Sequence, residues 1–187
     1  MALALLAAGA AAPAAAQLQL PKPVGYVNDF ANVIPPEQEA RITRLIEEVR
    51  AKSGGEIAVV TLPSLQGQPV DEVGLQILRQ WGVGAKTQIG DSLNNTGAVI
   101  LVAPKERQTR VELGYTTNTF VTAAEAGRIR DEMSPYFRKG DFGGGLLLGT
   151  ATLAQKYAQH FGFKLTGDVP TEPQAAPQSG GRGPGFL

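Results

Sequence analysis

Hydrophobic side chains recur every three or four residues in four stretches of the chain, residues 36–52, 69–81, 122–137 and 142–161. This spacing places them on one face of a helix. Pro36 stands at the start of the first stretch, where a helix does not need its N–H, and Gly54 follows the end. Thr122 and Glu125 open the third stretch with the pattern of a capping box. The pattern therefore predicts four helices.

Three shorter runs have the pattern of β-strands. Residues 56–62 and 98–103 are almost continuously apolar, which is typical of strands buried on both faces of a sheet. Residues 109–113 alternate polar and apolar side chains, so one face of that strand is expected to meet water. A helix joins the first two strands, which makes them parallel through a right-handed crossover. The short connection at residues 104–107 makes the third strand antiparallel to the second.

This order of elements, α-β-α-β-β-α-α, predicts an α/β fold. Helices would cover both faces of a small mixed β-sheet in a three-layer α/β/α sandwich of the Rossmann-like kind. The 187 residues are enough for one domain of ordinary size, which the pattern places at residues 24–163. Residues 17–23 are expected to form a linker before this domain.

The two ends of the chain have a composition unlike that of the domain. Residues 1–16 are almost all Ala and Leu without charge, and small residues precede Gln17, which is typical of a cleaved signal peptide. The domain is therefore expected outside the cytoplasm, either periplasmic or secreted. Residues 164–187 carry four prolines among Gly, Gln and Ser and are expected to be disordered. A membrane tether beyond this tail is a further expectation.

Composition removes several classes of function. The 17 Lys and Arg residues balance 17 Asp and Glu residues, so the chain lacks the positive charge that nucleic-acid binding requires. Cysteine is absent, which excludes disulfides, thiolate zinc sites and a cysteine nucleophile. His160 is the only histidine, and its place in the last turn of the predicted fourth helix suits the helix dipole better than a catalytic triad with Ser64.

Six short segments of the sequence form a recognisable series along the chain. They are Val27–Ile34, Ser53–Val60, Trp81–Gly84, Gly97–Val102, Arg110–Tyr115 and Phe137–Phe142. In this order the blocks resemble the TPM domain family over residues 24–161. The resemblance implies a domain outside the cytoplasm or in an organelle lumen, often tethered to a membrane. The family includes a thylakoid-lumen protein described as an acid phosphatase with calcium binding, and accessory proteins of membrane complexes.

The sequence departs from the family where acidic residues are usual. The family motif Asp-Asn-Gly before the second strand is here Asn95-Thr96-Gly97, and Gly-Tyr-Gly-Leu-Glu after the third strand is here Gly-Tyr-Thr-Thr-Asn at residues 114–118. Neutral oxygens alone give a weak calcium site, because calcium affinity rises with the charge of the ligands. The metal site expected here is therefore a weak one for Ca²⁺, formed by Asp91 and Asn95.

The start of the second predicted strand, the end of the third and the start of the third helix lie at one end of the sheet. Candidate ligand-binding residues at this end are Asn94, Thr96, Thr116, Asn118 and Thr122. The alternative for this end is a solvated loop followed by an ordinary helix cap.

The opposite end of the sheet gathers Asp29, Ser64, Arg107 and Asp141. Ligands of open α/β sheets favour the carboxyl ends of parallel strands, which lie at this end. Asp29 and Asp141 are the candidate catalytic residues, and the alternative is that each caps a helix or a turn.

Two functions of different classes follow from these observations. The first is an accessory or binding module for a membrane-associated protein complex, with weak or no metal binding, which the missing carboxylates favour. The alternative is an acid phosphatase in which carboxylates hold Ca²⁺ or Mg²⁺ to neutralise the charge of the phosphate.

Overall fold

A computed structural model of the chain describes residues 18–84 and 95–166. Four strands lie in these residues, β1 (Val27–Asp29), β2 (Glu56–Thr61), β3 (Gly97–Ala103) and β4 (Gln108–Leu113). The α-helices are α1 (Pro36–Ser53), α2 (Val70–Gln80), α3 (Ala123–Arg138) and α4 (Phe142–Phe161). A short 3-10 helix, η1 (Thr117–Thr119), precedes α3.

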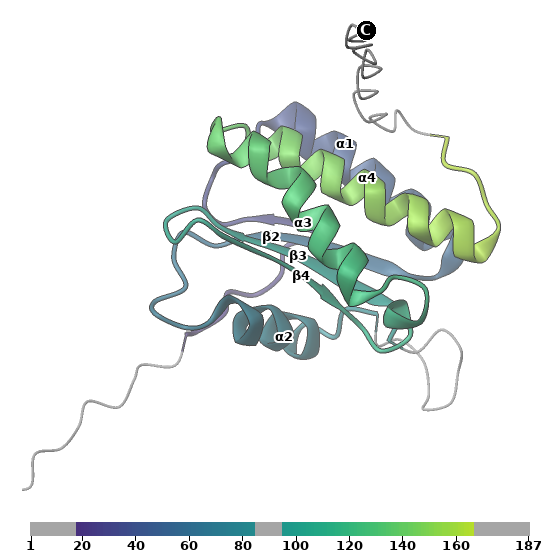
Figure 1. The fold of residues 1–187 in the computed structure, drawn as a ribbon, viewed down its shortest axis with the longest axis horizontal. Coiled ribbons are helices and arrows are strands. Elements are labelled where there is room, and N and C mark those ends of the chain that lie inside the picture. The colour runs from purple at the N-terminus through teal and green to yellow at the C-terminus, as the bar shows by residue number, and fades with distance from the viewer. Residues whose placement is uncertain (1–17, 85–94, 167–187) are drawn as a thin grey trace, which may run out of the picture.

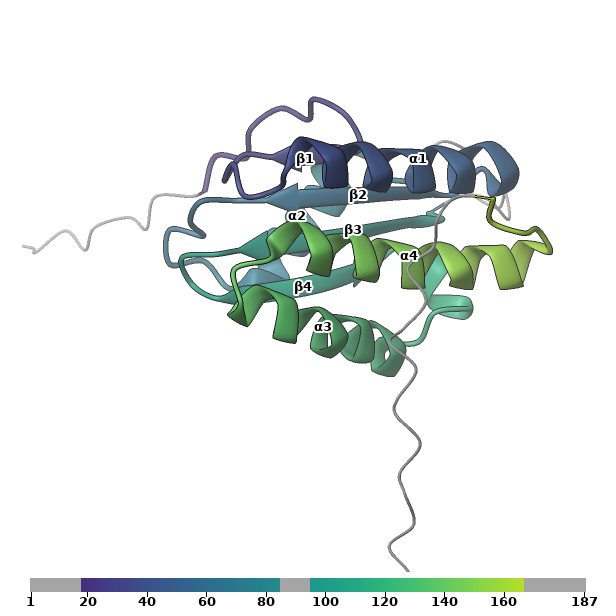
Figure 2. The same cartoon turned by 90° about the horizontal axis from the view of Figure 1, so that it is seen from above.

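The strands form one sheet in the order β1-β2-β3-β4. β1, β2 and β3 are parallel, and β4 runs antiparallel to β3. α1, α3 and α4 cover one face of the sheet and α2 covers the other (Figures 1 and 2). The predicted three-layer α/β/α sandwich around a small mixed sheet is confirmed.

The prediction of three strands was wrong by one, because β1 was not foreseen. This strand has three residues, too few for an alternating pattern to be recognised. Its pairing with β2 defines it instead, with Val27 opposite Val59 and Asp29 opposite Thr61. The pairing places Asp29 at the end of the edge strand, directly beside β2.

The ends of the helices follow the signals in the sequence. α1 begins at Pro36 and ends before Gly54, which adopts a left-handed conformation with a φ angle of 71°. α3 begins after Thr122 with the predicted capping box. Across the two described ranges, no helix combines the length and the apolar character that crossing a membrane requires.

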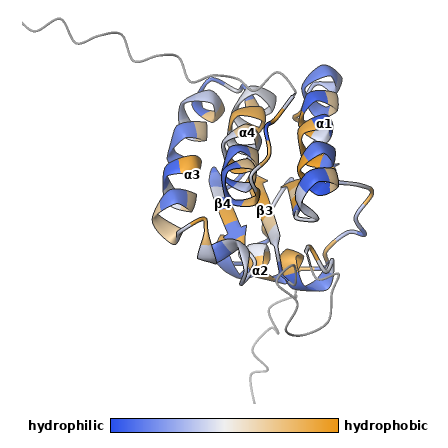
Figure 3. Cartoon of the chain, turned by 90° about the vertical axis from the view of Figure 1, so that its right-hand side faces the viewer, coloured by the Kyte–Doolittle hydropathy of each residue, from blue (hydrophilic) through white to orange (hydrophobic). Residues whose placement is uncertain are grey.

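The sheet separates two hydrophobic clusters (Figure 3). Ile57 and Val59 of β2 belong to the cluster under α1, α3 and α4, whereas Ala58 and Val60 belong to the cluster over α2. All seven residues of β3 are buried. The continuous apolar sequence of this strand predicted that both faces of the sheet would be covered here.

The packed part of the chain is longer than residues 24–163. Leu18 is 5% exposed and belongs to the cluster over α2, so the stretch predicted as a linker contributes to the core. At the other end Leu165 packs against the opposite cluster, and the N–H of Thr166 donates to Oε1 of Glu48 in α1 at 2.7 Å. The predicted signal peptide and most of the predicted tail lie outside the described residues.

Two glycines, one in α4 and one in α3, differ in how closely the neighbouring helix approaches them. A Cβ atom added at Gly149 in α4 would press against Sδ of Met133 and lie 3.0 Å from its Cγ, and Met133 is fully buried. A Cβ atom at Gly127 in α3 would meet no atom within 4 Å.

We expect Gly149→Ala to lower the free energy of unfolding by about 1–3 kcal/mol through overpacking. Gly127→Ala is the matched control, and we expect it to raise the free energy of unfolding by about 0.5–1 kcal/mol because alanine is the better helix former. Denaturant unfolding of both variants measures the two effects. Stabilisation by both substitutions would show that α4 does not approach Met133 as described.

Candidate functional site

Loops gather at two edges of the sheet. We call the edge where β1, β2 and β3 end the carboxyl edge, and the edge where β2 and β3 begin the amino edge. The β3–β4 hairpin and the turn between α3 and α4 both lie at the carboxyl edge (Figure 1). The structure places Asp29 at the end of β1, and it places Ser64, Arg107 and Asp141 in the loops of this edge, where the chain order had put them.

Asp29 ties the loop after β1 to the sheet. Its Oδ1 accepts hydrogen bonds from the N–H of Val33 at 3.1 Å and from the hydroxyl of Thr61, and its Oδ2 accepts from the N–H of Ile34 at 2.8 Å. Thr61 is fully buried and in turn accepts a bond from the N–H of Ala31. Both carboxylate oxygens therefore bind the protein's own donors, and Asp29 fixes the path of the chain into α1.

Asp141 is the N-cap residue of α4. Its Oδ1 accepts a hydrogen bond from the N–H of Gly144 at 2.8 Å, as a capping aspartate does. The capping interpretation of Asp141 is confirmed. Both candidate catalytic residues, Asp29 and Asp141, thus hold nearby backbone N–H groups.

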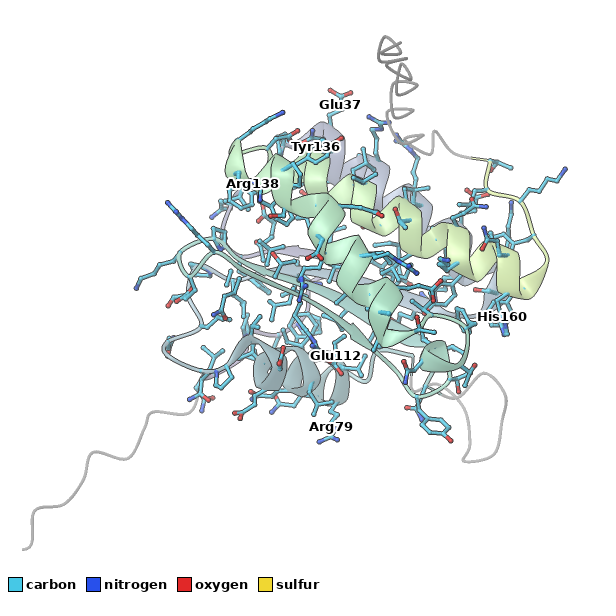
Figure 4. All side chains as sticks on the ribbon, viewed as in Figure 1. Glu37, Arg79, Glu112, Tyr136, Arg138 and His160 are labelled. Carbon is cyan, nitrogen blue, oxygen red and sulfur yellow. The ribbon has the colours of Figure 1, made fainter. Side chains whose placement is uncertain are left out.

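Ser64 lies against the β3–β4 hairpin. Its hydroxyl donates to Oε1 of Glu106 at 2.7 Å, and the N–H of Leu65 donates to the same oxygen at 3.0 Å. Burial raises the pKa of Glu106, but hydrogen bonds, chiefly those from Ser64 and Leu65, outweigh it and keep the pKa below its usual value. Ser64 is therefore the partner of a carboxylate, while His160 lies at the far end of α4 (Figure 4).

A pocket of about 570 Å³ opens beside the β3–β4 hairpin. One wall is the hairpin, and the other is the second half of α3 with the start of α4. Three arginines line it, Arg107 from the hairpin and Arg130 and Arg138 from α3. Asp29 and Asp141 are not among the lining residues. The charged side chains of this pocket are mostly cationic, and it is separate from the two candidate acids.

The amino edge contains a buried hydrogen-bond network. The hydroxyl of Tyr157 in α4 donates to the carbonyl of Thr96 at 2.9 Å and lies 3.0 Å from Oγ1 of Thr117. Oγ1 of Thr117 donates to the carbonyl of Gly97 at 2.9 Å. Tyr157, Thr96 and Thr117 are fully buried, and burial raises the pKa of Tyr157. The neutral phenol therefore joins α4 to the start of β3 and to η1.

The candidate ligand-binding residues of the amino edge differ in exposure. Thr96 has no exposed surface, and Thr116 is half-buried. Asn118 is exposed and lines a hollow of about 240 Å³ between β4 and α3. Thr122 is exposed, and its side chain caps α3. The structure thus brings Thr116, Asn118 and Thr122 to the surface near the start of α3 and buries Thr96.

The predicted weak metal site lies only partly in the described residues. Asn95 has a left-handed backbone with a φ angle of 60°, and its N–H donates to the carbonyl of Gly84 at 2.9 Å. Asp91 and Asn94 lie outside the described residues. Within residues 18–84 and 95–166, no group of three or more Asp, Glu, His or Cys side chains is placed to hold a metal ion.

Thr122 and Glu125 form the capping box of α3. Oγ1 of Thr122 accepts from the N–H of Glu125 at 3.2 Å, and Oε2 of Glu125 accepts from the N–H of Thr122 at 2.8 Å. Nζ of Lys156 in α4 lies 2.6 Å from Oε1 of Glu125. The hydrogen bond from Lys156, followed by those from Thr122, lowers the pKa of Glu125 to about 2. The start of α3 is therefore already occupied by the protein's own carboxylate.

Sequence reasoning missed Arg130 and Arg138 as site residues. With Ser134 between them, they occur at intervals of four along α3, and this spacing places all three side chains on one face of the helix. The interval is visible in the sequence, but the prediction used only the apolar face of this helix.

The order of strands and the three layers define a small α/β sandwich whose acidic residues hold loops and helix ends. A family model described as the TPM domain matches residues 27–156. The chain belongs to the TPM domain family, as its sequence blocks indicated.

Three of the structures that resemble the chain were determined by NMR. The N-terminal domain of a protein from P. gingivalis is 30% identical with a TM-score of 0.65, and the match covers 74% of this chain and 85% of that one. The N-terminal domain of the cg2496 protein from Corynebacterium glutamicum is 21% identical with a TM-score of 0.54, over 79% and 88% of the two chains. The BA42 protein from Bizionia argentinensis is 19% identical with a TM-score of 0.58, over 76% and 93%. The last two support the fold alone. No curated protein matches the chain significantly.

The contact between Glu125 and Lys156 predicts how the free energy of unfolding depends on pH. Because the pKa of Glu125 is about 2 in the folded chain against a usual value of 4.5, its stabilising contribution is complete above pH 4.5 and is lost as the pH falls toward 2. In Glu125→Gln the amide can still accept from Thr122, so the variant removes mainly the charge. We expect the difference in unfolding free energy between wild type and variant to shrink between neutral pH and pH 2. A difference that does not change with pH would contradict this assignment.

Proposed function

We propose that this TPM domain acts outside the cytoplasm as a binding module of a membrane-associated protein complex, with weak or no binding of metal. The observation that carries the proposal is the structural role of the Asp29 carboxylate. Both oxygens of its carboxylate accept hydrogen bonds from within the domain, and the residue holds the loop that leads into α1. A catalytic carboxylate instead needs an oxygen directed at a substrate, a metal or a water molecule.

The other acidic residues support the same proposal. Asp141 caps α4, and Glu125 belongs to the capping box of α3, so each carboxylate is bound at the start of a helix. At the amino edge, Thr and Asn stand in this chain where acids are usual in the family. Calcium ligands without charge give low affinity.

The proposed location rests on the two ends of the sequence. Residues 1–16 have the composition of an exported leader, and residues 164–187 have that of a flexible tail that would let the domain reach a partner. The resemblance to a family of extracytoplasmic and often membrane-tethered proteins points the same way.

Calcium titration and a phosphatase assay separate the binding module from the metal-assisted acid phosphatase. We expect isothermal titration of the full chain with Ca²⁺ to give a dissociation constant above about 10⁻⁴ M. Asp91→Ala is the control for the weak site and is expected to remove any residual heat. We expect hydrolysis of p-nitrophenyl phosphate to stay at background with and without Ca²⁺ or Mg²⁺.

Micromolar calcium affinity, or metal-dependent hydrolysis that is lost in Asp29→Ala or Asp141→Ala, would favour the phosphatase instead. Since both aspartates stabilise local structure, circular dichroism of each variant must show that the domain is still folded. Ser64→Ala is a further control, because it alters the same edge of the sheet without removing a carboxylate.

The proposed location predicts the N-terminus of the mature protein. We expect mass spectrometry of the protein purified from its own cells to find a chain that begins near Gln17, because small residues at positions 14 and 16 precede it. An intact leader on protein recovered from the cytosol would count against export.

A further inference from the structure

The pocket beside the β3–β4 hairpin holds more positive than negative charge. Arg107, Arg130 and Arg138 line it, and Asp131 is the one carboxylate among the described residues of its lining. Three positive charges against one negative charge leave a surplus of two. A concave site with such a surplus attracts an anion, and a doubly charged anion matches it best.

The three guanidinium groups differ in how far they are already paired. Nε and Nη2 of Arg130 bond Oδ1 of Asp131 at 3.0 and 2.9 Å. Nη1 of Arg138 donates to Oγ of Ser134 at 2.8 Å. The guanidinium of Arg107 has no hydrogen bond or ion pair with any of the described residues. Arg107 and the remaining donors of Arg138 are therefore available to a ligand.

Two other carboxylates of the same edge are held by hydrogen bonds from elsewhere in the domain. Glu106, in the hairpin, is held by the hydroxyl of Ser64 and the N–H of Leu65. Asp141, in the turn before α4, is held by the N–H of Gly144. Neither carboxylate is part of the lining.

The backbone at Arg107 is unusual for an arginine. Its φ angle is 54°, in the left-handed region, and its N–H donates to the carbonyl of Pro104 at 3.2 Å in the turn of the hairpin. Glycine occupies this region of a hairpin turn without steric cost, whereas a residue with a Cβ atom is strained there. A strained backbone at a residue whose guanidinium is unpaired and lines a pocket is accounted for if the side chain binds a ligand there.

The pocket also has an apolar part. The rings of Phe137 and Phe142 stack with centroids 5.4 Å apart and an angle of 20° between their planes, and both rings line the pocket beside Val102. The volume of about 570 Å³ lies in the range of small-molecule sites. A ligand that fills this pocket needs a charged head for the arginines and an apolar body for the rings.

We propose that this pocket binds a phosphate or phosphonate group carried on a small organic body, with the doubly charged head between Arg107 and Arg138 and the body against Phe137 and Phe142. Phosphate is favoured over a single carboxylate because the dianion matches the surplus of charge and because guanidinium groups bind its oxygens in pairs. Binding here makes and breaks no covalent bond. The proposal goes beyond the proposed function and does not depend on it.

Phenylphosphonate is a suitable probe, because its carbon–phosphorus bond is not an ester and binding is therefore measured apart from any phosphatase activity. We expect saturable binding by the full chain, followed by isothermal titration or by ligand-observed NMR. Benzoate, with one negative charge on the same ring, is expected to bind more weakly.

Arg107→Gly separates binding from stability. The substitution removes the guanidinium and also relieves the left-handed backbone, so we expect the dissociation constant to rise about tenfold while the Tm also rises. Arg138→Gln is the second variant and is expected to weaken binding to a similar extent. Arg128→Gln is the matched control, since this exposed arginine of α3 does not line the pocket, and binding should not change.

Vesicles distinguish the two sources of such a head group, a soluble molecule and a lipid. Sedimentation with phosphatidylcholine vesicles containing phosphatidic acid, reversed by phenylphosphonate, would support a lipid headgroup as the ligand. Binding of phenylphosphonate without vesicle capture would support a soluble ligand. The proposal is overturned if phenylphosphonate does not bind at millimolar concentration, or if Arg107→Gly and Arg138→Gln leave its binding unchanged.

Discussion

The hydroxyl of Tyr157 lies between three segments that are far apart in the chain. It donates to the carbonyl of Thr96 at the start of β3 and touches Thr117 in η1, which in turn bonds the carbonyl of Gly97. In this fully buried place, each polar atom left unpaired would cost about 1–3 kcal/mol. The last helix, the first residues of β3 and the turn before α3 must therefore meet in one geometry. These shared hydrogen bonds therefore fix the position of the helical layer on the sheet.

This network joins the elements of the amino edge, whereas the pocket of about 570 Å³ lies at the carboxyl edge. At the carboxyl edge the acids and the bases have different roles. Asp29 and Asp141 are bound to backbone N–H groups of their own loops, so they shape the edge. The arginines that extend from the hairpin and from α3 keep donors that no described residue uses. Unpaired guanidinium donors at a concave edge attract anions, and the proposed phosphate site rests on this property.

The sequence predicts the features that depend on near neighbours in the chain. The cap at Asp141 and the capping box at Thr122 could be predicted because each involves residues three positions apart. β1 could not be predicted, since its three residues become a strand only by pairing with β2. The cationic pocket was missed for a related reason, because its two walls are more than 20 residues apart and meet only in the folded domain. The burial of Thr96 likewise depends on Tyr157, which comes from the last helix.

The strand order, which repeats the order of the chain, has a consequence for how the domain assembles as it is synthesised. Each new strand finds its neighbour already present, so the sheet can grow without waiting for a later segment. The helical layer cannot be completed in this way, because α4, the last element, lies beside α1, the first helix, with Gly143 against Pro35 at one end and Nζ of Lys52 bonded to the carbonyl of Lys164 at the other. A nascent chain that stops before α4 would leave the apolar faces of α1 and β3 uncovered. We therefore expect the domain to resist proteases and aggregation only after its C-terminal helix has been synthesised.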